Sequence, residues 1–255
     1  EEFCWQLAAA GHDLVLVARR EDALRALAGS LTNVAGVRAE VIAAYGNTCW
    51  LGLPGCTVVG EEDDHIVPHS HGGRATVANI RRACKHCNAS RQDRVLYGYG
   101  ARLHMIVCPP GCDAVALDYI TEHSRSADPV VAYSYLADAM GVAAHESRAE
   151  RVAVGMAWSA AYRSFTTCAE PLDVWCVRSF PSSRRHQRML DEWLALDYDI
   201  HVMDVDYAEA WDHAVTEDER VLARRWYSLH LSQALVDARQ AARRARLTAL
   251  GLRSD

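Results

Sequence analysis

The sequence predicts an α/β protein in which a small, turn-rich domain lies between two segments of alternating helix and strand. Residues 1–44 and 96–255 combine helical periodicity with short apolar runs, whereas residues 45–95 are broken by turns, Gly and Pro. The turn-rich segment also holds four of the nine cysteines and four of the 12 histidines. The chain has 255 residues, which is enough for two or three domains. We therefore expect domains over residues 1–44, 45–95 and 96–255.

The N-terminal segment is predicted to follow the order helix, strand, helix, strand, over residues 1–10, 13–18, 21–31 and 37–43. Its run L-A-A-A-G-H-D-L-V-L-V-A-R-R-E-D-A-L resembles the Rossmann-like second strand region of short-chain dehydrogenases. The resemblance implies that Arg19 lies where the family's arginine meets the ribose phosphate of the cofactor. Dehydrogenase activity is not expected, because the single lysine, Lys85, has Arg81 instead of Tyr four residues before it. We interpret the segment as a fusion remnant or packing element.

The C-terminal segment is predicted to contain a helix ending at His123, long helices near its end, and strands over residues 103–107, 174–178 and 200–204. Its run A-R-L-H-M-I-V-C-P-P-G-C-D-A-V-A resembles the start of P-loop kinases and ATPases. The family's first Gly, last Gly, phosphate-binding Lys and Mg²⁺-binding Ser/Thr are replaced by Cys108, Asp113, Ala114 and Val115. The resemblance therefore implies a degenerate P-loop kinase-like domain, with no nucleotide bound. Its expected role is scaffolding, binding a protein partner or extending a DNA surface.

Charge is distributed unevenly along the chain. The net charge is −6, which excludes a wholly basic nucleic-acid binder. Residues 74–94 nevertheless hold six basic side chains and one acid, so an anionic polymer is expected to bind there. Residues 189–219 hold eleven acids and no Lys or Arg, and we expect them to pair with the arginines near residues 239–253.

Two features indicate the compartment. No apolar run approaches the roughly 20 residues that span a bilayer, so no membrane association is predicted. The N-terminal stretch lacks the basic start, apolar middle and cleavage site of a secretion signal, so we expect a cytoplasmic protein with reduced thiols.

Two cysteine pairs bracket the polar part of the central segment. Cys49 and Cys56 lie in a Gly/Pro-rich stretch, and Cys84-x-x-Cys87 follows 28 residues after Cys56. Four thiolates in two pairs suit a tetrahedral Zn²⁺ ion, which would cross-link two loops that have little core of their own. The alternative is that these cysteines are small buried hydrophobic side chains. The pairing favours structural zinc.

Between the cysteine pairs lie D-D-H-I-V-P-H-S-H-G-G, then Asn79, then C-K-H-C-N ending at Asn88. These motifs resemble those of HNH endonucleases, whose ββα-metal core is often held by two cysteine pairs. Asn79 follows Asp64 by fifteen residues and Asn88 follows Asn79 by nine, as the three motif positions of that family require. HNH proteins with such companion domains resemble those of phages and mobile elements.

The residue types account for the chemistry of phosphodiester hydrolysis. Asp64 and Asn88 offer hard oxygen ligands that suit Mg²⁺ or Mn²⁺, and such an ion stabilises charge on the phosphate and the leaving oxygen. His65, with an ordinary pKa near 6.5, can act as the general base at neutral pH. The resemblance implies that Asn79 braces the loop and orients His65. His69 and His71 are interpreted as solvated surface side chains.

Four arginines flank the motif: Arg81, Arg82, Arg91 and Arg94. The planar guanidinium group suits contacts with DNA phosphates, and we expect these four to position the DNA backbone with little sequence preference. The leading prediction is a metal-dependent HNH endonuclease acting on DNA. The alternative is a non-catalytic, zinc-stapled module that binds nucleic acid and holds no catalytic ion.

Overall fold

The computed structural model describes residues 21–142, 147–179, 184–214 and 216–252. The chain forms two compact units, Glu1–Asp93 with Leu247–Asp255, and Arg94–Arg246. The helix predicted over residues 1–10, the strand over 13–18 and Arg19 lie outside the described residues. No helix within the described ranges combines the length and apolar character needed to cross a membrane. Compactness alone does not identify a domain's family, so the three-domain assignment stays a prediction.

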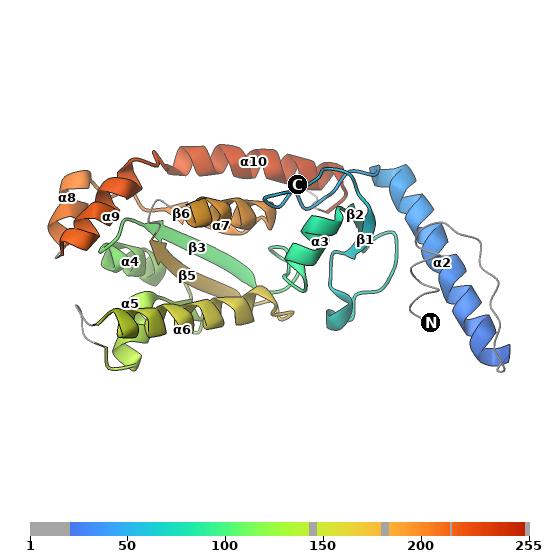
Figure 1. Cartoon of the computed structure of the whole chain (residues 1–255), viewed down its shortest axis with the longest axis horizontal. Helices are drawn as coiled ribbons and strands as arrows, with labels where there is room; N and C mark the ends of the chain where they lie inside the picture. The colour runs from blue at the N-terminus through green and yellow to red at the C-terminus, as the bar shows by residue number, and fades with distance from the viewer. Residues whose placement is uncertain (1–20, 143–146, 180–183, 215, 253–255) are drawn as a thin grey trace. The chain divides into compact units, whose positions relative to one another are not determined.

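The described part of the smaller unit begins with helix α2 (Glu21–Tyr45) (Figure 1). The strand predicted over residues 37–43 is therefore wrong, because this stretch continues the helix. Val37, Val41 and Tyr45 recur at four-residue spacing, which places them on one helical face. Val41 is fully buried, whereas Ala39, which a strand would place on the same face as Val41, is exposed. The helical period thus separates inside from outside better than the two-residue alternation of a strand.

A ββα arrangement completes the smaller unit. Its elements are β1 (Glu62–His65), the short 3₁₀ helix η1 (His69–His71), β2 (Ile80–Ala83) and α3 (Lys85–Arg91). The strands pair antiparallel, with Asp64 opposite Arg81. A Cβ atom at Gly73 would lie 1.9 Å from the carbonyl oxygen of Val67, so the loop between the strands requires glycine there.

The larger unit is built on a four-stranded parallel sheet in the order β4-β5-β3-β6. Its strands are β3 (Arg102–Cys108), β4 (Val130–Val131), β5 (Asp173–Ser179) and β6 (Asp199–Val202). Its helices are α4 (Asp113–His123), α5 (Tyr133–Ala139), α6 (Arg148–Thr166), α7 (Arg184–Ala195), α8 (Tyr207–His213), α9 (Glu217–Tyr227) and α10 (Gln233–Ala249), which belongs to this unit as far as Arg246.

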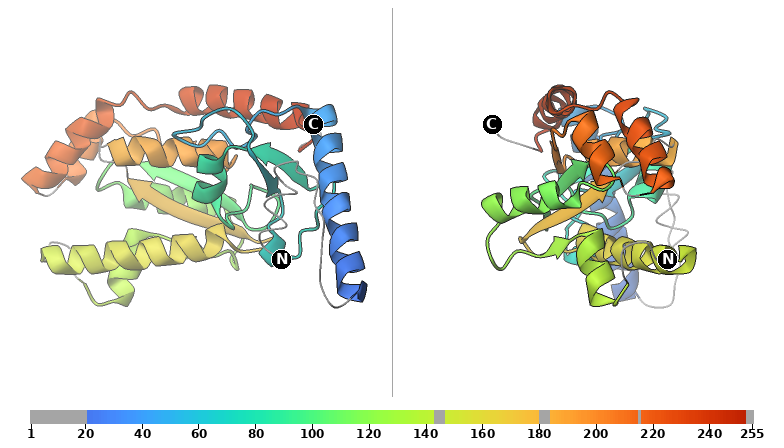
Figure 2. Two further views of the ribbon diagram at one scale, coloured as in Figure 1. Left: turned by 45° about the vertical axis from the view of Figure 1, so that its right-hand side comes forward. Right: turned by 90° about the vertical axis from the view of Figure 1, so that its left-hand side faces the viewer.

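Both faces of this sheet are buried, as parallel sheets require. Leu103, Met105 and Val107 of β3 point to one face, where they pack with buried side chains of α6, α7, α9 and α10. Ile106 and Cys108 point to the other face, where α4 and α8 contribute the apolar partners. Figures 1 and 2 show α6, α7 and α10 running lengthwise beside the strands. The strands predicted over 103–107 and 174–178 are confirmed, and β6 is shorter than the predicted 200–204.

Acidic and basic stretches of the larger unit pair as predicted. Arg239 of α10 contacts Asp191 of α7 at 2.5 Å, and Arg244 contacts Asp197 at 3.3 Å. Asp197 is fully buried, so an unpaired carboxylate there would be costly. The opposite charges of residues 189–219 and of α10 therefore stabilise one another within the unit.

Candidate functional site

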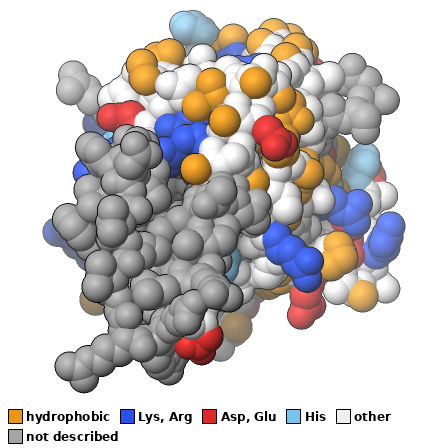
Figure 3. Space-filling model, turned by 90° about the vertical axis from the view of Figure 1, so that its right-hand side faces the viewer, with side chains coloured by type: hydrophobic (Ala, Val, Ile, Leu, Met, Phe, Trp, Pro, Cys, Tyr) orange, Lys and Arg blue, Asp and Glu red, His pale blue; other side chains and the backbone are white. Residues whose placement is uncertain are grey.

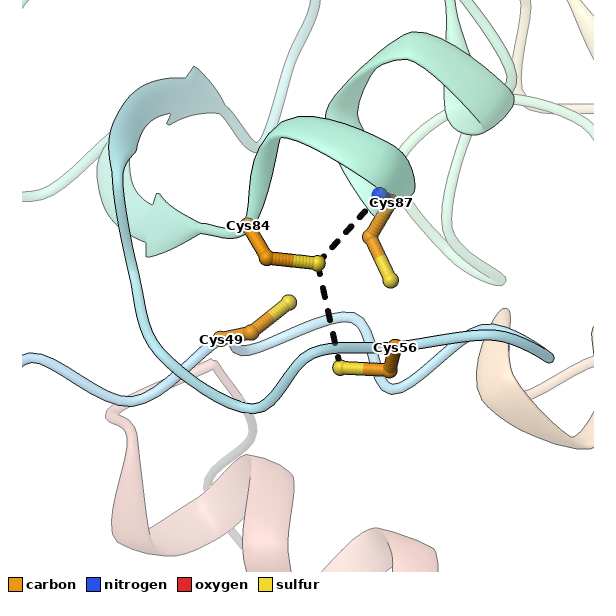
Figure 4. A group of neighbouring side chains, drawn as sticks. All are labelled: Cys49, Cys56, Cys84 and Cys87. Carbon is orange, nitrogen blue, oxygen red and sulfur yellow. Dashed lines mark hydrogen bonds between the residues drawn. The ribbon is translucent and has the colours of Figure 1, made fainter.

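The four predicted zinc ligands come together in the smaller unit. The sulfur atoms of Cys49, Cys56, Cys84 and Cys87 all lie within 4.8 Å of one another. Figure 4 shows them pointing toward a common centre, two from the loop before β1 and two from the start of α3. The structure thus confirms the grouping, and a closed set of four thiols is the donor set of structural zinc sites.

Local hydrogen bonds prepare this cluster for a cation. Cys84 is the N-cap of α3, and its sulfur accepts a hydrogen bond from the backbone N–H of Cys87 at 3.4 Å. Burial by itself would raise the pKa of Cys84, but hydrogen bonds from Thr57 and Cys87 outweigh it and lower the pKa to about 6. Thiolates are the species that bind zinc, so Cys84 is prepared as a ligand, whereas burial raises the pKa of Cys56 and Cys87.

A cleft of about 430 Å³ lies beside β1 and α3. Three of the residues predicted for the catalytic site line it, namely Asp64, His65 and Asn88. Glu62 and Lys85 line it as well. These three predicted residues are therefore brought together in one concave surface, and Asn79 is not among the residues that line it.

The carboxylate of Asp64 lies at the floor of the cleft and is 5 % exposed. Its two oxygens accept hydrogen bonds from Arg91 at 2.7 Å and from the indole N–H of Trp50 at 2.8 Å. Burial raises the pKa of Asp64 despite these two partners. Each carboxylate oxygen has two lone pairs, so both retain one for a further contact.

His65 follows on the same strand and is half-buried. Its Nε2 atom is buried and has no hydrogen-bond partner among the described residues. Burial, followed by the like charges of His69 and Arg91, lowers the pKa of His65. The ring is therefore neutral at neutral pH and has a nitrogen available to accept a proton.

Two side chains clamp the backbone that follows His65. Asn79 accepts from the N–H of Val67 at 2.9 Å and donates to the carbonyl of Val67 at 3.1 Å. Arg91 donates to the carbonyls of His65 and Ile66, both at 2.5 Å. The contacts of Asn79 are those expected of a bracing residue. Arg91, on α3, holds the same stretch of backbone through its carbonyl groups.

Glu62 is a cleft residue that the sequence analysis did not single out. It shares a strand face with Asp64, two residues away, and accepts a hydrogen bond from the Asn88 side-chain amide at 2.8 Å. The sequence could have indicated Glu62, because residues two apart on a strand point to the same face and Glu62 lies two residues before Asp64.

Three of the four arginines predicted to contact DNA phosphates are interior, which corrects that prediction. Arg81 and Arg91 are each 1 % exposed and Arg82 is 6 % exposed. Arg81 donates to the carbonyl of Leu250 at 2.7 Å, and Arg82 pairs with Asp63. Arg94 belongs to the larger unit and pairs with Glu192 at 3.3 Å. Their guanidinium groups satisfy protein carbonyls and carboxylates, which sequence spacing could not reveal.

Exposed cations are sparse among the residues of the smaller unit whose burial is described. Lys85 is exposed at the cleft, and Arg74 is exposed on the loop between the strands. On the face drawn in Figure 3, the described basic side chains are separated by acidic, apolar and uncharged ones. Among the residues of the smaller unit whose burial is described, the exposed cations therefore form no continuous basic band.

Comparison with known protein families adds one finding to this geometry. Residues 55–94 match the family model of the HNH endonuclease. The match spans β1, β2, α3 and three of the four clustered cysteines. It indicates a nuclease or nucleic-acid-binding function for residues 55–94, which we call the HNH segment.

Neither the curated proteins nor the solved structures contain a match to the chain. The family match does not extend beyond the HNH segment. The resemblances of residues 1–44 to dehydrogenases and of residues 96–255 to P-loop kinases therefore remain predictions.

Proposed function

We propose that the HNH segment is a metal-dependent endonuclease that hydrolyses DNA phosphodiester bonds, with His65 as the general base. The observation that carries the proposal is the unpartnered Nε2 of His65, held in a cleft with the oxygen donors Asp64 and Asn88. A neutral imidazole whose Nε2 has no partner among the described residues has a lone pair that can take a proton from water.

The residues of the cleft also fit a catalytic cation. Asp64 and Asn88 are the proposed ligands, and Glu62 adds a second carboxylate on the same strand face. Oxygen donors of this kind suit Mg²⁺ or Mn²⁺ more than Zn²⁺. Such an ion, when bound, stabilises the charge that develops on the phosphate and on the leaving oxygen.

The remaining steps belong to the chain's own side chains. His65 removes a proton from the attacking water, and its lowered pKa keeps it unprotonated beforehand. Asn79 and Arg91 hold the backbone at residues 65–67, so the imidazole stays at a fixed position relative to Asp64. Lys85 at the cleft is placed to contact a neighbouring phosphate.

The test is plasmid cleavage by protein from which loosely bound metal has been removed while its cysteine-bound zinc is retained. We expect supercoiled plasmid to become nicked or linear when Mg²⁺ or Mn²⁺ is restored, and to stay intact without them. Asn88→Ala is expected to require a higher ion concentration for the same rate, because it removes a ligand. Cleavage that proceeds equally in excess chelator would contradict the proposal.

A second candidate function is a zinc-stapled module that binds nucleic acid without cutting it. It is favoured by one observation, namely that both oxygens of Asp64 already accept hydrogen bonds from Arg91 and Trp50. In that case both carboxylate contacts are structural and no catalytic ion binds. DNA binding with no cleavage in any divalent ion would select this candidate.

Lys85 provides a prediction about DNA affinity. Lys85→Ala is expected to weaken DNA binding on all sequences and to lower the slope of log K against log salt by about 1, since one phosphate contact is lost. Fluorescence anisotropy with a labelled duplex at several salt concentrations measures both quantities. Arg225→Ala, an exposed arginine on α9, is the matched control and should change neither. An unchanged salt slope in Lys85→Ala would remove this residue from the DNA surface.

For the larger unit we propose a degenerate P-loop domain that binds no nucleotide. Strand β3, the loop at residues 109–112 and helix α4 follow one another as the resemblance requires. Asp113 lies in the first turn of α4, where the family's nucleotide phosphates would approach. A carboxylate at that position opposes phosphate binding, which supports a scaffolding or partner-binding role.

A further inference from the structure

We propose that the larger unit holds a second, separate metal site, formed by His104, Asp199 and His201 and suited to a borderline transition-metal ion such as Zn²⁺. His104 lies on β3 and the other two on β6, next to β3 in the sheet. Asp199 pairs with His104 in the strand register, and His201 lies two residues further along. The three side chains therefore project from the same sheet face.

The ligand atoms lie at the spacing that a metal ion requires. One Asp199 oxygen, Oδ2, is 3.2 Å from Nδ1 of His104 and 3.0 Å from Nε2 of His201. The three candidate ligand atoms all lie within 4.8 Å of one another. Metal–ligand bonds of about 2.0–2.1 Å in a tetrahedral site separate neighbouring ligand atoms by roughly 3.4 Å. Small side-chain shifts are enough to admit an ion.

In each imidazole ring, the nitrogen that would not bind the metal already has a hydrogen-bond partner, as in known metal sites. Nε2 of His104 lies 3.0 Å from Asp173 Oδ1, and Nδ1 of His201 lies 3.0 Å from the Tyr119 hydroxyl. Ligating histidines almost always bond through the other ring nitrogen to a carboxylate or similar group, which fixes the ring and its tautomer. Asp173 and Tyr119 supply that support here.

The surroundings make the cluster accessible but rigid. The side chains of His104, Asp199 and His201 are 11 %, 30 % and 24 % exposed, so an ion can enter from solvent. His104 stacks on Trp175, with ring centroids 4.3 Å apart. Two imidazoles and one carboxylate are the protein ligands typical of zinc sites that keep an open position. The site thus takes a borderline ion rather than Mg²⁺, and leaves a coordination position for water or a ligand.

The site is distinct from the two in the smaller unit. All five of its polar residues belong to the larger unit, and they supply no sulfur ligand. Its position is also unexpected, because His104 and Asp199 lie toward the amino ends of their strands, whereas ligands of parallel α/β sheets usually bind beyond the carboxyl ends. The proposal therefore does not depend on the endonuclease or on the P-loop resemblance.

The experiment is a calorimetric titration of the full chain with Zn²⁺. The cysteine cluster is first loaded with zinc, and excess Mg²⁺ is kept in the buffer to occupy the hard oxygen ligands of the cleft. Wild-type protein is expected to bind one further equivalent of Zn²⁺. Asp199→Asn and His201→Gln should each lose this equivalent. Tyr119→Phe, which removes only the supporting hydroxyl, should weaken it by about 10–100-fold.

His230→Asn is the matched control, since His230 is an exposed histidine of the same unit with a left-handed backbone that Asn tolerates. It should bind the further equivalent as wild type does. Circular dichroism of each variant checks that the unit is folded, and Tyr119→Phe keeps the test informative if a ligand variant unfolds. A wild-type chain that takes up no further zinc would overturn the proposal. So would a further equivalent retained by both Asp199→Asn and His201→Gln.

Discussion

His65→Ala is expected to lower the rate of DNA cleavage by about 10²–10⁴-fold, the usual contribution of a positioned general base. The side chain makes no hydrogen bond through Nε2 that the fold would lose, so the variant should remain folded and should bind DNA with wild-type affinity. Initial rates of plasmid cleavage in Mg²⁺ and anisotropy of a labelled duplex measure the two effects separately.

His71→Ala is the matched control for this variant. His71 lies in η1, which follows β1, and is not among the residues that line the cleft, so cleavage should continue at close to the wild-type rate. Equal cleavage by His65→Ala and wild type would show that another group, or none, removes the proton. Equal loss in both histidine variants would point to a disturbed loop instead of a missing base.

Cys87→Ser is expected to abolish folding of the β1–β2–α3 arrangement. The cysteine cluster joins the loop before β1 to the start of α3, and a structural zinc ion contributes about 10–16 kcal/mol to the folding of small zinc-binding peptides at neutral pH. The strands have four residues each, so their backbone pairing alone stabilises them only marginally. Cleavage and one equivalent of zinc should be lost together.

Hydrogen exchange locates this effect. Amides of β1 and β2 should exchange rapidly in Cys87→Ser, while those of β3 and β5 stay protected, because the larger unit has its own apolar core. Cys168→Ser, a cysteine of the larger unit outside the cluster, is the control and should keep wild-type zinc content and protection. A Cys87→Ser protein with full zinc content would mean that the four thiols do not form the zinc site.

The fold was predictable where one periodicity dominates. The apolar runs of β3 and β5 are buried on both faces and could only be strands of a parallel sheet. The helix at residues 37–43 was missed because Val37, Ala39 and Val41 also alternate as a strand would. The exposed side chain of Ala39, which a strand would bury beside Val41, shows which period the tertiary structure uses.

Within the site, sequence spacing predicted which side chains lie close together, but not which of them are buried or which groups they bind through hydrogen bonds. The cysteine cluster, the cleft position of His65 and the loop contacts of Asn79 follow from motif order. The burial of Arg81, Arg82 and Arg91 could not be foreseen, since a basic residue in a short strand or helix has the same pattern whether it faces solvent or a buried carbonyl. The His104, Asp199 and His201 cluster joins strands about 95 residues apart in sequence, and no local motif marks it.

The contact of Arg81 with Leu250 affects how this protein is made. The guanidinium group has local acceptors at Val77 and Ile80, but its Nε donates to a carbonyl that lies 169 positions later in the chain. During synthesis the β1–β2 hairpin emerges long before that acceptor exists, and an unsatisfied buried cation is costly. The smaller unit therefore reaches its final packing only after the segment beginning at Leu247 has been translated. A fragment that ends near residue 95 lacks this segment, so it should be less stable than a chain that includes residues 247–252.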